Sequence, residues 1–109
     1  MEDFEIDEEI DKVERRVPHW KQNPSQINSR ILSLFMQLSD NGENGVFLDM
    51  LRDEFETLYP EESNIFDRNY NQMKNFGPHN HAKVFEEDEE YTVRLWYPVR
   101  DIIKELYSY

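Results

Sequence analysis

Apolar residues recur every three or four positions in several stretches of the chain, the spacing that places them on one face of an α-helix. The most regular stretch follows Pro24, with Ser25 as the expected N-cap. Its apolar positions are Ile27, Ile31, Leu34, Phe35 and Leu38. In a second stretch, which ends before Pro60, they are Leu48, Leu51, Phe55 and Leu58. The spacing predicts two core helices, joined by a turn over residues 40–45 whose two Asn-Gly pairs suit positive φ.

A third, more polar helix is predicted over residues 64–76. Its apolar residues Phe66, Tyr70 and Met73 share one face. The opposite face carries Arg68, Asn71, Gln72 and Asn75. Gly77 is expected to end the helix in a left-handed conformation, and Pro78 prevents its continuation. We therefore expect a helix that is buried on one side and polar on the other.

Two β-like runs follow, HAKVFE (residues 81–86) and YTVRLW (residues 91–96), joined by an acidic turn. In the second run Tyr91, Val93 and Leu95 alternate with polar residues, the period of a half-buried strand. A last helix is predicted to begin at Pro98, with Val99, Ile102, Ile103 and Leu106 on its apolar face. The first three of these helices and the hairpin should share a core. Its expected buried residues include Phe35, Leu51, Phe55, Tyr70 and Leu95.

The N-terminal segment combines a narrow apolar stripe with many charges. The stripe consists of Ile6, Ile10, Val13 and Val17. Pro18 is expected to end this helix, and residues 19–24 to form a connector anchored by Trp20. Two interpretations are open, namely a partly disordered acidic arm and a docking or dimerisation helix. We therefore divide the chain into an N-terminal arm or helix with its connector (residues 1–23) and a domain over residues 24–109.

The composition predicts a folded protein. A chain of 109 residues has the size of one domain, and 38% hydrophobic with 14% aromatic residues is too apolar for a disordered chain. The absence of cysteine excludes disulfide and thiolate–metal scaffolds. No apolar run approaches the length of a membrane span, and the N-terminus is acidic where a secretion signal is basic. We expect a soluble, cytoplasmic protein with no membrane partner.

The net charge of −12 is unevenly placed. Residues 1–14 hold eight acids and one lysine, whereas residues 15–30 hold four basic residues and no acid. Residues 86–90 (EEDEE) add five consecutive acids, directly after a slightly basic segment over residues 63–85. A field this negative repels nucleic acid at long range. A contact with nucleic acid would therefore have to come from the segments that are not acidic.

No motif for catalysis or metal binding stands out. His79 and His81 lie two residues apart, but no cysteine completes a ligand set, so a polar loop is expected there. The EEDEE run lacks the spaced ligands and the glycine of a calcium loop. The chain has no nucleophile motif, glycine-rich phosphate loop or zinc-hydrolase signature. We expect a protein that is not an enzyme and needs no cofactor.

Over residues 24–107, the predicted order is helix, short strand (Val46-Phe47), helix, helix, hairpin, helix. This order resembles that of a winged helix-turn-helix domain. The resemblance implies an α+β, mainly helical fold: a three-helix core with a β-hairpin wing and extra N- and C-terminal helices. Such domains commonly place the third helix in the major groove of DNA and the wing over the adjacent backbone. This chain departs from that pattern in its acidic wing tip and in the acids on the outer face of its second helix, Asp49, Asp53, Glu54 and Glu56.

Carried over to this chain, the resemblance implies a nucleic-acid-binding or partner-binding surface on the third helix. Its candidate residues are Arg68, Asn71, Gln72 and Asn75, flanked by Lys74 and Lys83. Arg, Asn and Gln side chains can make bidentate contacts with base edges, and the lysines could reach phosphates. The alternative is that these polar side chains only solvate an exposed helix face.

Three functions therefore stand as hypotheses. The first is a regulator that binds duplex DNA through the third helix and forms a homodimer through the terminal helices. The second is a protein-interaction module on a winged-helix scaffold. The third is an acidic DNA mimic that occupies the DNA site of another protein. The first predicts a salt-sensitive complex with duplex DNA, whereas the other two predict a protein partner.

Overall fold

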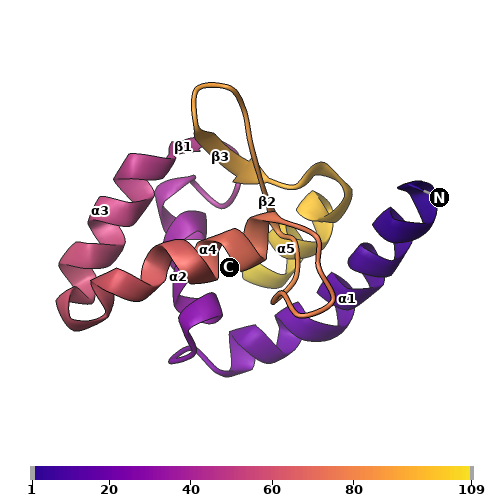
Figure 1. The fold of residues 1–109 in the computed structure, drawn as a ribbon, viewed down its shortest axis with the longest axis horizontal. Helices are drawn as coiled ribbons and strands as arrows, with labels where there is room; N and C mark the ends of the chain where they lie inside the picture. Colours follow the sequence, from indigo (N-terminus) through magenta and orange to yellow (C-terminus); the bar gives the residue numbers. More distant parts are fainter. Residues whose placement is uncertain (1, 109) are drawn as a thin grey trace.

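The computed structural model describes residues 2–108 (Figure 1). Side chains are described for residues 5–62 and 64–108. In this part of the chain the fold is α+β and mainly helical. The α-helices are α1 (Glu2–Gln22), α2 (Ile27–Leu38), α3 (Leu48–Leu58), α4 (Phe66–Lys74) and α5 (Arg100–Tyr107). Two 3₁₀ segments, η1 (Pro60–Ile65) and η2 (Tyr97–Val99), precede α4 and α5. The strands are β1 (Val46–Phe47), β2 (Phe85–Glu87) and β3 (Thr92–Leu95).

The three short strands form one antiparallel sheet in the order β1-β3-β2. Val46 lies opposite Val93, and Phe85 lies opposite Leu95, so the buried residues of the strands share one face. Helices α2, α3 and α4 pack against one another beside this sheet. The connection between β2 and β3 projects from the body of the molecule (Figure 1).

The apolar spacing predicted the centre of the core. Phe35, Leu51, Phe55, Tyr70 and Leu95 are all buried, as expected. The ring of Phe35 lies 5.0 Å from that of Phe85, and Tyr70 stacks between Phe66 and Phe85 at 5.6 and 5.5 Å. An aromatic cluster therefore joins α2, α4 and the sheet.

Helix α1 does not end at Pro18, so that prediction is wrong, and residues 19–22 are helical instead of forming a connector. Proline removes one hydrogen bond from a helix interior, which usually ends or kinks it. Here Val17 and Trp20, on either side of Pro18, are both buried in the core. The carbonyl of Trp20 also accepts a 2.6 Å hydrogen bond from the Ser29 hydroxyl on α2. Packing on both sides of the proline thus holds the helix together.

The apolar stripe of α1 is part of the core. Val13 and Val17 are fully buried, and Ile6 and Ile10 pack against the core from its edge. The apolar face of α5 is also buried, and α1 contacts both α2 and α5. The stripe is therefore neither a solvent-exposed arm nor a free docking face, because the rest of the chain covers it.

Helix ends differ from the prediction in two places. Gln26, and not Ser25, precedes α2, and its side chain makes no capping hydrogen bond. Helix α4 stops at Lys74, and Gly77 does not adopt positive φ. The carbonyl groups at the end of α4 instead accept hydrogen bonds from the following loop. The donors are Lys83 Nζ to Lys74, Val84 N to Met73, and Asn80 Nδ2 to Asn75 and Phe76. With these carbonyls satisfied, α4 needs no left-handed glycine.

Positive φ occurs elsewhere. In the first Asn-Gly pair, both Asn41 and Gly42 are left-handed, as predicted, but the second pair is not. Tyr91 has a φ of 61° and lies in the turn before β3, so the prediction that it faces the core as a strand residue is wrong. A bulky side chain rarely adopts this backbone conformation.

Candidate functional site

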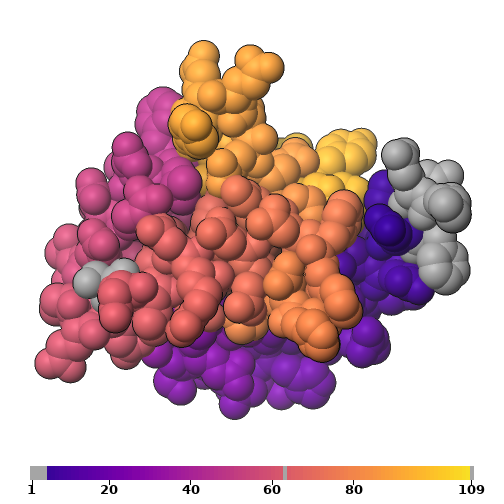
Figure 2. Space-filling view, in the orientation of Figure 1, coloured from indigo at the N-terminus to yellow at the C-terminus, as the bar shows by residue number. Residues whose placement is uncertain are grey.

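The predicted polar face of α4 is on the surface. Helix α4 and the loop after it occupy the middle of the face seen in Figure 2. Arg68, Asn71 and Asn75 are exposed, and Gln72 is half-buried. Arg68 makes no hydrogen bond or ion pair with another described residue. The structure therefore brings these four polar side chains together along one exposed helix face.

The two flanking lysines are engaged inside the fold. Lys83 Nζ donates hydrogen bonds to the carbonyls of Lys74 and Phe85, and lies 5.5 Å from the ring centre of Trp96. Burial lowers the pKa of Lys83. Lys74 pairs with Glu87 at 3.4 Å. Neither ammonium group is free to reach a phosphate unless it gives up these contacts.

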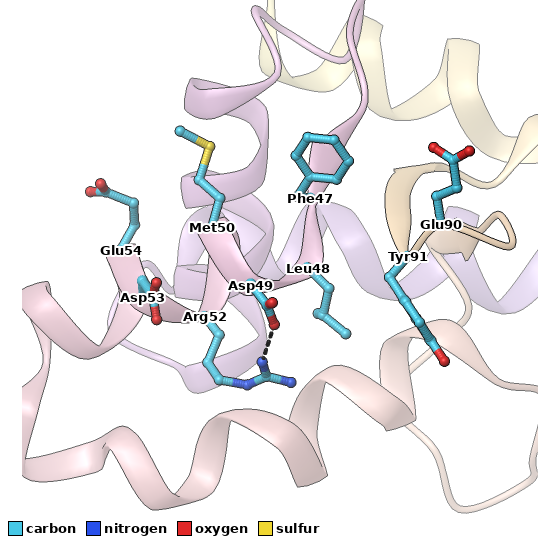
Figure 3. Close-up of a pocket in the computed structure, with 9 residues that line it drawn as sticks. All are labelled: Phe47, Leu48, Asp49, Met50, Arg52, Asp53, Glu54, Glu90 and Tyr91. Atoms are coloured by element: carbon cyan, nitrogen blue, oxygen red, sulfur yellow. Dashed lines mark hydrogen bonds and ion pairs between the residues drawn. The ribbon is translucent and has the colours of Figure 1, made fainter.

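A second surface was not predicted. Three large apolar side chains are mostly exposed close together: Phe47 (60%), Met50 (51%) and Tyr91 (65%). They line a groove of about 720 Å³ between α3 and the turn that precedes β3 (Figure 3). Solvent-exposed apolar residues are common singly, but a cluster in a concavity is typical of an interaction site.

Acidic residues surround the groove. The carboxylates on its lining are Asp49, Asp53, Glu54 and Glu90. Asp49 pairs with Arg52 at 2.9 Å, and Arg52 also binds Asp67 of α4 at 2.9 Å. The other three carboxylates form no ion pair within the described part of the chain. The groove lining therefore combines exposed apolar side chains with three carboxylates that form no ion pair within the described part of the chain.

The turn that presents Tyr91 is firmly held. The carboxylate of Asp88 accepts hydrogen bonds from the backbone N–H groups of Glu90 and Thr92 and pairs with Arg94 at 2.9 Å. The two N–H groups and the guanidinium lower the pKa of Asp88. The carbonyl of Tyr91 accepts a 2.9 Å hydrogen bond from the Leu48 N–H at the start of α3. These contacts fix the left-handed backbone and hold the Tyr91 ring at the groove.

Part of the groove could have been found in the sequence. Phe47 and Met50 are apolar residues spaced i and i+3 at the start of α3, outside the core-facing set of Leu51 and Phe55. Leu58, which we assigned to the core face, is 55% exposed. The position of Tyr91 depends on the turn conformation and on pairing across the sheet, neither of which the spacing of residues encodes.

The two histidines of the 79–81 loop are in different environments. His79 is exposed. His81 is half-buried, with Nε2 2.8 Å from Asn69 Oδ1 and its ring beside Trp20. Desolvation lowers the pKa of His81, and the charges of Arg16 and Lys12 lower it further. Within the described residues, His, Asp and Glu side chains form no group of three or more that could hold a metal ion.

Because of His81, the free energy of unfolding should decrease as the pH is lowered. Its pKa is 6.5 when unperturbed and lower in the folded chain, so the unfolded state binds more protons in this range. The contribution of His81 is complete above about pH 6.5 and is lost as the pH falls through the lowered folded pKa. His81→Gln should therefore flatten the decline in melting temperature between about pH 7 and 5. His79→Gln is the matched control and should retain the decline. An unchanged decline in His81→Gln would contradict this assignment.

Comparison with protein-family models, with curated proteins and with solved structures found no match for this chain. None of the helices over residues 2–108 has the length and apolarity needed to cross a bilayer.

Proposed function

We propose that the chain is a non-catalytic protein-interaction module that contacts its partner through the groove between α3 and the β2–β3 turn. The observation that carries the proposal is the cluster of Phe47, Met50 and Tyr91, which are more than half exposed in one groove. Aromatic residues and methionine are enriched in protein interfaces, where their burial supplies most of the binding energy. A soluble domain gains nothing for its own stability from leaving them in water.

The proposed scaffold is a winged-helix domain. Helix α2, strand β1, helices α3 and α4, and the β2–β3 hairpin follow one another in the order expected for such a domain. The sheet order β1-β3-β2 also suits this scaffold, because the first strand pairs with the second strand of the hairpin. In this assignment α4 is the third helix and the β2–β3 turn is the tip of the wing. The groove then lies between the second helix and the wing.

The charges favour a protein partner over duplex DNA. Glu90 at the tip of the wing and Asp53 and Glu54 on α3 form no ion pair with another described residue, so they would repel phosphates. Lys74 and Lys83, which could have contacted phosphates, are held by internal contacts. The exposed side chains of Phe47 and Met50 also separate this proposal from a DNA mimic, which would need an array of acids there instead.

DNA binding through α4 is the second candidate, and Arg68 is the observation that favours it. The side chain is exposed and has no partner among the described residues, on the same face as Asn71 and Asn75. A guanidinium and two amides could contact base edges. This function would have to overcome the repulsion from the acidic groove.

A duplex titration tests the proposed function. We expect no saturable binding of a labelled random-sequence duplex at about 50 mM salt, measured by fluorescence anisotropy, because the net charge of −12 opposes it. Saturable binding that weakens with salt and with Arg68→Ala would overturn the proposal and establish the second candidate. The triple variant Asn71→Ala, Gln72→Ala, Asn75→Ala is the control for α4. It should fold with unchanged or slightly higher stability, because alanine is the better helix former.

A further inference from the structure

We propose that the partner segment in the groove is a basic amphipathic helix, with apolar side chains on one face and Lys or Arg residues beside them. This inference rests on the proposed function and specifies the chemistry of its partner. It follows from four features of the groove: its exposed apolar side chains, the backbone conformation of Tyr91, its carboxylates without an ion pair among the described residues, and the kind of backbone that can lie along it.

The groove lining offers exposed apolar side chains to a partner. Phe47 comes from the end of β1, Met50 from the first turn of α3, and Tyr91 from the turn before β3. In the view of Figure 3, Phe47 and Met50 project upward and Tyr91 projects downward, beside Leu48 and Arg52. Leu58, at the end of α3, is a further exposed apolar residue but is not part of the groove lining. Methionine adapts to the shape of an incoming side chain, and tyrosine supplies a large contact area at low entropic cost.

The backbone of Tyr91 supports a binding role for its ring. A non-glycine residue at a φ of 61° is strained. The ring of Tyr91 is too exposed for its packing within the chain to offset the energy of this strain. Strained residues of this kind are concentrated at binding and catalytic sites. The turn thus keeps an aromatic side chain at the groove at a cost to stability, which points to a ligand that contacts it.

The carboxylates of the groove determine the charge of the partner. Three acids nearby are already in ion pairs: Asp49 and Asp67 share Arg52, and Asp88 pairs with Arg94. Asp53, Glu54 and Glu90 remain without an ion pair among the described residues. Cations of a partner bound in the groove would pair with these carboxylates, and the net charge of −12 would accelerate the encounter. An acidic or neutral apolar segment would leave the negative charge of these carboxylates uncompensated.

The backbone of the groove favours a helix over a strand. An added strand needs a free sheet edge, but β1 has only two residues, and the N–H of Leu48 just after it already bonds to Tyr91. Helix α3 has 11 residues and is about 16 Å long. Along that length a partner helix presents anchors at i, i+3 or i+4, and i+7. A second copy of this chain in a symmetric contact would place the same acids opposite each other, which is unfavourable.

A designed peptide tests this inference. The probe is a labelled Leu/Lys peptide of about 18 residues with leucines at helical spacing, and the control peptide has the same composition in scrambled order. At about 0.15 M NaCl, where long-range attraction is screened, the patterned peptide should bind at least about tenfold more tightly in fluorescence anisotropy. Equal binding of the two peptides would show attraction by charge alone and would overturn the inference.

Variants locate the binding site. Met50→Lys should weaken binding of the patterned peptide by about tenfold or more, since it removes an anchor and repels the cations. Tyr91→Gly should weaken it similarly while preserving the fold, because glycine accepts positive φ without strain. Tyr97→Ser is the matched control, because Tyr97 is 77% exposed but lies outside the groove. Loss of affinity in Tyr97→Ser, or full affinity in both groove variants, would overturn the inference. Such a failure would leave the proposed function standing, since that function is contradicted by duplex binding and not by weak binding of this one peptide.

Discussion

Replacing Phe55 with alanine is expected to lower the free energy of unfolding by about 3–5 kcal/mol, the range for deleting a fully buried aromatic side chain. Phe55 is completely buried in α3, with its ring 5.0 Å from that of Tyr59 and 5.3 Å from that of Phe66. Its removal would leave a cavity where α3, η1 and α4 meet. Urea denaturation followed by circular dichroism measures the change.

Leu58→Ala provides the control on the same helix. Leu58 is mostly exposed, so its truncation should cost less than about 1 kcal/mol. If Phe55→Ala cost as little as Leu58→Ala, the orientation of α3 would be wrong. The groove would then be wrong as well, because the same helix positions Met50.

Trp20→Ala is expected to cost a similar amount, about 3–5 kcal/mol. Trp20 is buried two residues after Pro18, in the part of α1 that the sequence suggested was a connector. Its ring lies against His81, and the loop around His81 is held to α1 by two hydrogen bonds from Arg16 to the carbonyls of Asn80 and His81. Loss of the indole should therefore loosen both α1 and this loop.

Arg15→Ala is the matched control for Trp20→Ala. Arg15 is exposed on the same helix, and its replacement should change stability by less than about 0.5 kcal/mol. Hydrogen exchange adds a local measurement, because Trp20→Ala should speed exchange along α1. A cost below about 1 kcal/mol for Trp20→Ala would mean that α1 is a detachable arm after all.

The fold class and the core were predictable because hydrophobic periodicity reports burial directly. Ile31 and Phe35 in α2, and Leu51 and Phe55 in α3, are buried because each pair lies four residues apart on one helix face. The exposed face of α4 was predictable for the same reason. These features depend on local spacing alone, and no knowledge of distant contacts is needed to find them.

The remaining features depend on contacts between distant segments. Helix α1 continues past Pro18 because the core holds Val17 and Trp20, and α4 ends at Lys74 because loop donors such as Lys83 satisfy its carbonyls. Local propensity predicted a helix end and a left-handed glycine instead, and tertiary contacts overrode both. The groove could not be predicted from local sequence for the same reason, since Tyr91 reaches it only through the turn geometry and the hydrogen bond to Leu48.

The lysines of the predicted site show why residue type alone was insufficient. Lys74 and Lys83 have the charge that a phosphate contact requires, but the sequence does not show that Glu87 and backbone carbonyls occupy them. Arg68 and Asn71 are exposed, as a contact surface requires. The role of the polar face of α4 in binding remains a prediction.

Site-specific photo-cross-linking in cells tests most directly whether the groove is the surface that meets a protein partner. A photoreactive phenylalanine analogue would replace Met50 in the groove, Asn71 on α4 or Gln37 on α2, all of which are exposed. We predict that the analogue at position 50 forms discrete adducts with another protein. The analogue at position 71 or 37 should form no such adducts, or much weaker ones. Adducts from position 71 without any from position 50, or no adducts with another protein from position 50, would contradict the account.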